Sequence, residues 1–169
     1  LYVKLKFAVY KVTLRDETGT ETIYELGYAD SLPADAFFVP LKSGFAFQGF
    51  ETEGYSELAV DIAGNTLINW KSDTVLVPRF AEIAFDIKET VYDGYDQSNI
   101  FDKIYVGGVK TKDVLCEIYD TDGYLTKFVD AGEYKAVIMV ADAVLGIGSI
   151  EVTCLIAKAK LYVSADDIM

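Results

Sequence analysis

The 169-residue chain contains no histidine, the side chain that most often serves as a general base and is a leading metal ligand. Its absence argues against an enzyme and against a metal site, although Asp, Glu, Lys and Cys remain as alternative chemical groups. We therefore expect a protein that is not an enzyme and that binds no metal and no cofactor. No residue of the sequence is assigned to a catalytic, cofactor-binding or metal site.

Basic residues are also scarce, because 15 Lys and Arg stand against 27 Asp and Glu, and the net charge is −12. A chain of this charge repels the phosphates of nucleic acid, so nucleic acid is not an expected partner. The acidic residues are spread along the chain, and this distribution favours a role in solubility over an acidic binding tail.

Long apolar runs are missing as well. No window approaches the roughly 18 uninterrupted apolar residues of a membrane helix, so we expect no membrane insertion in this segment. The chain has no initiator Met, no signal peptide and no sorting motif, and it opens with the strand-like residues 1–6, Leu-Tyr-Val-Lys-Leu-Lys. We therefore expect a piece of a longer protein.

Aromatic and other apolar residues are abundant. Hydrophobic residues make up 51% of the chain, and 12 Tyr and 10 Phe lie among many Val and Ile. This composition favours β-strands around a packed core. The length suits one ordinary domain or two small ones.

In the first half, residues 44–50 read Gly-Phe-Ala-Phe-Gln-Gly-Phe, which predicts a strand with a heavy apolar load that runs to about Thr52. The glycine near each end allows other backbone to come close. We expect Phe45, Phe47 and the single tryptophan, Trp70, to be mostly buried, with the indole N–H hydrogen-bonded. Other segments with the alternation of a strand are 10–15, 22–28, 66–70 and 74–80.

Three connections between these strands have recognisable signals. Residues 16–20 predict a hairpin turn between the first two strands, and residues 71–73 predict one between the last two. Asp30 or Ser31 is expected to cap a short helical turn over residues 33–38.

The order of these features resembles the Listeria–Bacteroides repeat, also called the internalin B-repeat, over residues 7–82. The matching features are a hairpin, a Pro-containing connection, Gly-Phe-x-Phe-x-Gly-Phe, a Trp, and Ser-Asp-x-Val-Leu-Val-x-x-Phe. The family usually has Trp after the second glycine, where this chain has Phe50. The resemblance implies a small β-grasp-like fold, a mixed sheet with a short helical segment across it. Residues 1–5 are similar to the closing strand 76–80, so residues 1–6 are expected to be the tail of a preceding repeat.

In the second half, alternating segments separated by turn signals predict about seven short strands, which suggests a β-sandwich. The segments are 83–87, 100–106, 114–118, 124–128, 133–141 and 150–156, with turns or loops at 92–94, 107–108, 122–123 and 146–148.

Residues 130–134, Asp-Ala-Gly-Glu-Tyr, resemble the tyrosine corner of immunoglobulin-like domains, in which the Tyr hydroxyl bonds to nearby backbone. Together with the turn at 92–94 and the closing residues 158–163, they resemble the bacterial Ig-like repeats of the MBG and YDG families over residues 83–163. Residues 164–169 would then start a following repeat. Such repeats form arrays on long bacterial surface proteins, often beside the repeat that the first half resembles.

Cys116 and Cys154 are expected to be free, buried thiols, because alternation places both on the inward faces of their strands. An antibody domain has a Cys two residues after the corner Tyr, and here that position is Ala136. If Tyr134 opens strand F of the resembled fold, Cys154 lies on strand G and Cys116 most simply on strand C, with F between them. Strands two apart are about 9.5 Å from each other, and a disulfide needs Cα atoms within about 7 Å. On strand D or E, Cys116 would instead face Cys154 across the sandwich.

The motifs that carry chemistry in other proteins are incomplete here. Residues 120–123, Asp-Thr-Asp-Gly, open like a calcium loop, but the last ligand position falls on Ala131, so a hairpin turn is expected. Asp93, Asp96 and Asn99 are expected to be solvated loop residues rather than a weak calcium site. The glycine pairs lack the context of a phosphate loop, no Ser or Cys has a visible base partner, and no spacing singles out a Lys–Asn isopeptide pair.

These observations predict two domains joined near residues 81–83, with few contacts between the two domains. The expected function is a non-catalytic stalk or adhesin segment of a modular bacterial cell-surface protein, extracellular and attached to the cell wall through another region. Its expected partners are neighbouring repeats of the same chain. One alternative is a module whose exposed loops bind a host protein or glycan, which would have an exposed aromatic patch. Another is a fragment of a carbohydrate-active enzyme, which would need a pocket with convergent carboxylates.

Overall fold

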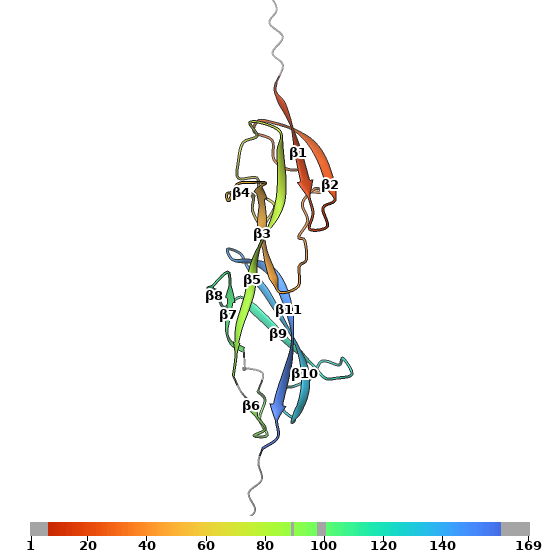
Figure 1. Ribbon diagram of the computed structural model, residues 1–169, viewed down its shortest axis with the longest axis vertical. Helices are drawn as coiled ribbons and strands as arrows, with labels where there is room; N and C mark the ends of the chain where they lie inside the picture. The colour runs from red at the N-terminus through yellow and green to blue at the C-terminus, as the bar shows by residue number, and fades with distance from the viewer. Residues whose placement is uncertain (1–6, 89, 98–100, 160–169) are drawn as a thin grey trace, which may run out of the picture.

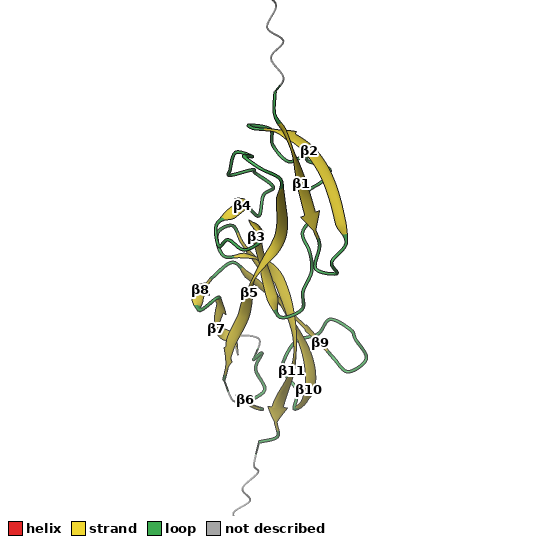
Figure 2. Ribbon diagram, turned by 45° about the horizontal axis from the view of Figure 1, so that its top comes forward, coloured by secondary structure: helices red, strands yellow, loops and turns green. Residues whose placement is uncertain are grey.

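One long strand, β5 (Thr74–Ile87), runs through the centre of the computed structural model, which describes residues 7–88, 90–97 and 101–159 (Figure 1). The described residues form strands, turns and loops without a helix, as Figure 2 shows, so the prediction of a mainly β protein is confirmed. The other strands are β1 (Val9–Arg15), β2 (Glu21–Gly27), β3 (Phe45–Thr52), β4 (Leu58–Val60), β6 (Thr90–Val91), β7 (Phe101–Val106), β8 (Val109–Thr111), β9 (Val114–Tyr119), β10 (Gly132–Asp142) and β11 (Gly146–Ala157).

The strands form one hydrogen-bonded path in the order β2-β1-β5-β3-β11-β10-β9, with β4 beside β3, β6 beside β11, and the β7–β8 hairpin beside β5. In Figure 1 the molecule is elongated, with β1 to β4 and the start of β5 at one end and β6 to β11 with the end of β5 at the other. We call residues 7–82 the upper half and the described residues from 83 to 159 the lower half.

The upper half contains a mixed sheet. β1 pairs antiparallel with β2 along its whole length, and it pairs parallel with β5 over Val12–Leu14. Val12, Leu14 and Leu26 all enter one hydrophobic core, because alternate residues of a strand share a face. The predicted hairpin of residues 10–28 is therefore confirmed.

The core of the upper half is built from large aromatic side chains. Trp70, Phe47 and Phe50 are fully buried, and the indole Nε1 of Trp70 donates to the carbonyl oxygen of Asp30 at 2.8 Å. A β-bulge at Gln48 shifts the alternation of β3, so that Phe47 and Phe50 reach the same core with ring centroids 5.1 Å apart. The predicted burial of Phe47 and Trp70 is confirmed.

Phe45 is less deeply buried than Phe47 and Trp70, although its partial exposure agrees with the prediction that it is mostly buried. The Nζ of Lys42 lies 4.0 Å from the centroid of its ring and 5.5 Å from that of Phe80. A cation over these two rings covers the apolar surface that the core does not reach.

The predicted helical turn over residues 33–38 is shorter than expected. Only a single turn forms there, in which the backbone N–H of Ala36 donates to the carbonyl oxygen of Pro33 at 2.9 Å. After this turn the consecutive rings of Phe37 and Phe38 both pack against Phe50, with centroids 6.2 and 5.5 Å away. Neighbouring residues of a helix point about 100° apart, so this aromatic packing favours a non-helical backbone.

The predicted strand at 66–70, and its hairpin with 74–80, are wrong. Residues 66–70 divide their backbone hydrogen bonds between two partners: the N–H of Leu67 donates to Ala59 at 2.8 Å, and the N–H of Trp70 donates to Tyr28 at 2.9 Å. The only ladder contact is an isolated bridge between Thr66 and Val60 of β4. This path brings Trp70 over the sheet and into the core.

The lower half has two packed layers of strands, β5-β7-β8 and β9-β10-β11. Ile83 and Ile104 from the first layer pack with Ile138 and Val140 from the second. The predicted tyrosine corner is confirmed, because the hydroxyl of Tyr134 donates to the carbonyl oxygen of Asp130 at 2.9 Å. The prediction of a new strand at 83–87 is wrong, since these residues continue β5 without a break.

The predicted strand at 124–128 is reduced to one bridge between Leu125 and Tyr119 of β9. Phe128 is fully buried, with its ring centroid 4.8 Å from that of Tyr134. Its entry into the core draws the chain away from the edge of β9, so the ladder cannot lengthen.

Both cysteines are free, as predicted, and β10 lies between β9, which carries Cys116, and β11, which carries Cys154. Cys154 is buried, whereas Cys116 is half-buried. Burial raises the pKa of the Cys154 thiol to about 11, and burial followed by the Glu117 carboxylate raises the pKa of Cys116.

The prediction of few contacts near residues 81–83 is wrong. Besides the uninterrupted β5, the strand β3 of the upper half pairs antiparallel with β11 of the lower half over Phe45–Phe47 and Ile147–Ser149. We call this paired region the joint. Ala46 of β3 is fully buried among the core residues of the lower half, including Ile83 and Ile138. Each half carries a complete alternating pattern, and such patterns do not specify which strands of the two halves become neighbours.

Candidate functional site

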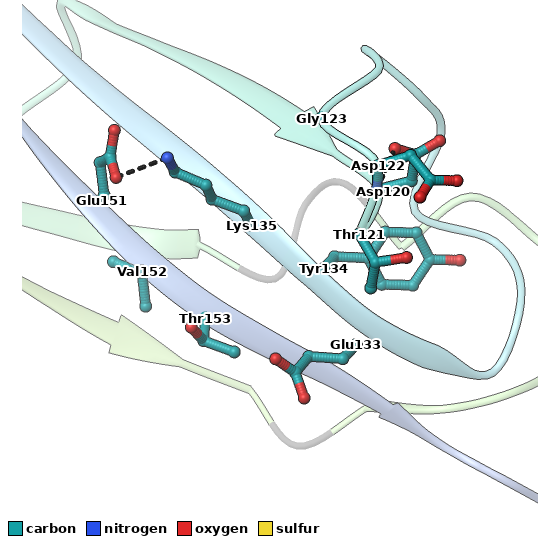
Figure 3. A pocket seen from close by; sticks show the side chains of 10 residues that line it. All are labelled: Asp120, Thr121, Asp122, Gly123, Glu133, Tyr134, Lys135, Glu151, Val152 and Thr153. Carbon is teal, nitrogen blue, oxygen red and sulfur yellow. Dashed lines mark hydrogen bonds and ion pairs between the residues drawn. The ribbon is translucent and has the colours of Figure 1, made fainter.

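The Asp120–Gly123 turn forms one wall of an open groove of about 670 Å³ on the lower half (Figure 3). The N–H of Gly123 donates to the carbonyl oxygen of Asp120 at 3.1 Å, and Oδ1 of Asp120 accepts the N–H groups of Asp122 and Tyr124 at 3.0 and 2.8 Å. The predicted hairpin turn is therefore confirmed, and the carboxylate of Asp120 serves to hold it.

The other wall of this groove consists of side chains from β10 and β11. Lys135 and Glu151 lie diagonally across the two strands and form an ion pair, with Nζ 2.6 Å from Oε2. Glu133 and Thr153 complete the wall, as Figure 3 shows. The groove is thus lined by four carboxylates and one ammonium group.

The geometry of these carboxylates limits what the groove can do. In Figure 3, Glu151 points to Lys135, Glu133 lies apart from this ion pair, farther along the two strands, and Asp120 and Asp122 stand at the turn. An acid–base pair for glycoside cleavage needs two carboxyl groups facing one bond, and a calcium site needs several oxygens around one point. Within residues 7–88, 90–97 and 101–159, no group of three or more His, Cys, Asp or Glu side chains is arranged to hold a metal ion.

A second groove, of about 440 Å³, lies at the joint. Its apolar walls include Leu58 and Ile62 from the upper half and Val144 and Ile147 from the lower half. The charged groups beside it are Asp61 and Asp142.

Both of these aspartates are engaged in their own turns. Asp61 accepts hydrogen bonds from Ala63 and Asn65 at 2.8–2.9 Å. Burial raises the pKa of Asp61, but these hydrogen bonds together lower it by more, so the net shift of the pKa is downward. Asp142 accepts from Leu145, Val144 and Thr111, and these bonds lower its pKa. Their oxygens therefore close loops rather than point into the groove as free acceptors.

Of the three loop residues weighed as a calcium site, Asp93 accepts the backbone N–H of Tyr95 at 2.9 Å, a bond within its own turn. Asn99 lies outside the described residues. Residues 107–108 form the turn between β7 and β8, which agrees with the prediction of a break there.

The feature that sequence reasoning missed is the role of Gly146 and Gly148, predicted as a loop but found in β11. A Cβ on Gly148 would lie 2.1 Å from the carbonyl oxygen of Phe45, and a Cβ on Gly146 would lie 2.6 Å from that of Phe47. A signal was present, because glycine inside a strand marks a close approach of other backbone, as was inferred for residues 44–50.

Comparison of the chain with protein-family models, with curated proteins and with solved structures gives no match. In the described part of the chain, no helix has the length and apolar character needed to cross a membrane.

Proposed function

We propose that this chain is a non-catalytic structural module, a stalk or adhesin segment, of a modular bacterial cell-surface protein. The resemblance to the Listeria–Bacteroides repeat and to the MBG and YDG repeats supports an extracellular location. It also supports neighbouring repeats of the same chain as partners, with attachment to the cell wall through another region.

The observation that carries this proposal is the position of the two ends. The described chain enters at the start of β1 and leaves at the end of β11, and in Figure 1 these points lie at opposite ends of the long axis. β5 runs along this axis from one half into the other. A module of this shape adds its full length to an array, which is what a stalk requires.

The same arrangement suits tension. Backbone hydrogen bonds of an antiparallel ladder lie perpendicular to the strands, so a force along the strands loads many of them together. A force applied at the start of β1 and the end of β11 acts on both strands in this direction.

The experiment that tests the proposal is antibody labelling of intact cells that express the native protein. We expect labelling without permeabilisation, and release of fragments when intact cells are treated with protease. Labelling that requires permeabilisation would overturn the proposal.

A binding module for a host protein or glycan is the second candidate, and one observation favours it. Tyr124 and Leu125 at the tip of the 120–128 loop are 71% and 67% exposed, and Tyr95 on the 92–97 loop is 76% exposed. The N–H of Gln97 donates to the carbonyl oxygen of Phe128 at 2.7 Å, so the two loops are joined. Exposed aromatic side chains held by such loops are common in binding surfaces.

Binding to a glycan array and to immobilised host matrix proteins separates the two candidates. If the loops bind, Tyr124→Ala should weaken binding about tenfold or more, as expected for an aromatic anchor. Tyr55→Ala is the matched control, because Tyr55 is equally exposed but lies in the upper half. Absence of binding on both surfaces would leave the stalk as the supported function.

A further inference from the structure

Among the described residues, the joint is the one place where backbone of the two halves comes together by strand pairing. We propose that it makes the halves a single cooperative unit, which unfolds in one transition because β11 is held against β3. Two domains on a short linker would instead unfold independently. Cooperative unfolding does not depend on the proposed function, whereas the use of this unit to carry tension rests on it.

The close approach of β3 and β11 requires glycine on β11. A Cβ on Gly148 would lie 2.1 Å from the carbonyl oxygen of Phe45 and 2.7 Å from Cα of Ala46. Both neighbours are backbone atoms, so the clash cannot be relieved by a side-chain rotation. Any larger residue at position 148 must therefore push the two strands apart.

Hydrogen bonds from three strands also meet at the joint. The N–H of Gly44 donates to Ser149 of β11 at 2.9 Å, and the carbonyl of Gly44 accepts the N–H of Ile83 of β5 at 2.9 Å. The side-chain amide of Gln48 donates to the carbonyl oxygen of Leu145 at 3.1 Å. Separation of β11 from β3 would leave several of these groups without partners at once.

The hydrophobic core crosses the same boundary. Ala46 belongs to the upper half but is fully buried, with a relative accessibility of 0%. It packs in the lower core with Ile83, Ile138 and Val140. Loss of the joint would remove this residue from the lower core and uncover part of that core. The pairing, the hydrogen bonds and the packing therefore depend on one another, which is the condition for cooperative unfolding.

The chain carries one natural probe of each half. Trp70 is the single tryptophan and is fully buried in the upper half, so its emission reports unfolding there. Cys154 is 3% exposed in the lower half, so labelling of both thiols of the chain, counted by mass, reports unfolding there. In urea, we expect the two transitions of the wild-type protein to have the same midpoint. Separate midpoints would overturn the proposal.

The variant that tests the joint is Gly148→Ala, with Gly132→Ala as its matched control. Gly132 is also a strand glycine of the lower half, but a Cβ there would meet only the ring edge of Tyr134, 4.0 Å away. We expect Gly148→Ala to separate the two midpoints by about 0.5 M urea or more, and Gly132→Ala to leave them coincident.

Coincident midpoints in Gly148→Ala would overturn the proposal. If that variant has no folded baseline, Gln48→Ala replaces it, with the same two outcomes. Surface labelling of cells is independent of this result, so failure of the cooperative unit and failure of the proposed function are distinguishable.

Discussion

The two halves build their cores in different ways. In the upper half one sheet is covered by irregular segments, and the largest buried side chains are Trp70, Phe47 and Phe50. In the lower half two layers of strands face each other, and the layers meet mainly through Ile, Val and Ala side chains such as Ile138 and Val140. An aromatic ring buries a large area from one backbone position, so it suits a core whose cover has no regular repeat. Alternating aliphatic residues suffice where a second layer of strands supplies the opposing surface.

The largest predicted effect follows from this contrast. Phe47→Ala should lower the free energy of unfolding by about 3–5 kcal/mol, because it removes a ring that contacts Phe37, Phe50 and Phe80 at centroid distances of 5.1–6.4 Å. Phe128→Ala in the lower half is the matched change, since Phe128 is also fully buried. Among the described residues, Phe128 has one ring partner, Tyr134, and it lies on a loop rather than in a strand, so its loss should fall at the lower end of the same range.

Urea unfolding of the whole chain measures both variants. The upper half cannot be tested as an isolated fragment, because the joint and β5 connect it to the lower half. A larger loss for Phe128→Ala than for Phe47→Ala would contradict the view that the upper core depends more on single rings.

The features that the sequence predicts well are local ones. The hydrogen bond of Tyr134 spans four residues, and the Asp120–Gly123 turn is held within itself, so a short motif contains all the needed information. The burial of Trp70 was also predictable, because a single large aromatic residue in a small β protein is placed in the core by its area alone.

The features that could not be predicted depend on the order of strands. Residues 66–70 have strand-like alternation, yet their hydrogen bonds go to Ala59 and Tyr28, which no local pattern specifies. The pairing of β3 with β11 joins residues about 100 positions apart. Gly146 and Gly148 favour a loop by propensity, and only the approach of β3 gives them a reason to lie in a strand. The candidate grooves depend on this same order and were not predicted.

A second prediction concerns the thiols, which occur only in the lower half. Burial raises the pKa of Cys154 from 9.0 to about 11, so the folded protein retains a proton that the unfolded chain loses in this range. The thiol of Cys154 therefore makes its full contribution to stability below pH 9, and this contribution is lost as the pH rises from 9 toward 11. Over this range the unfolding equilibrium constant increases by at most about tenfold per pH unit. Urea unfolding at several pH values, followed by Trp70 emission, measures this slope.

Tyr and Lys side chains also titrate at alkaline pH, so Cys154→Ala is the control for this slope. The difference between wild type and variant isolates the thiol, and we expect a shallower fall of stability in Cys154→Ala. Equal slopes in the two proteins would show that Cys154 does not carry the alkaline sensitivity of the lower half.

A third prediction compares the aromatic hydrogen bonds of the two halves. Tyr134→Phe removes the bond to the carbonyl oxygen of Asp130 while keeping the ring, so it should cost about 0.5–1.5 kcal/mol. Trp70→Phe removes both the bond to Asp30 and part of a fully buried ring, so its cost should be larger. Thermal unfolding of both variants measures the difference. A larger cost for Tyr134→Phe would mean that the corner holds the lower half more firmly than packing holds the upper one.

The smallest predicted effect is the loss of stability when a surface ion pair is broken, and it should differ between the two halves. Lys135→Met breaks the pair with Glu151, whose partners are both more than half exposed, so the loss should stay below about 1 kcal/mol. The strands that carry this pair, β10 and β11, are already paired along their length from Gly132 to Asp142. Arg15 differs, because its guanidinium bonds not only to Glu21, its register partner on β2, but also to Glu53 beyond the end of β3, and so connects β1 to a segment with which it does not pair. Arg15→Met should therefore destabilise the protein more than Lys135→Met, and added salt should reduce both losses. Urea midpoints at low and high salt test this order, and a greater loss in Lys135→Met would contradict it.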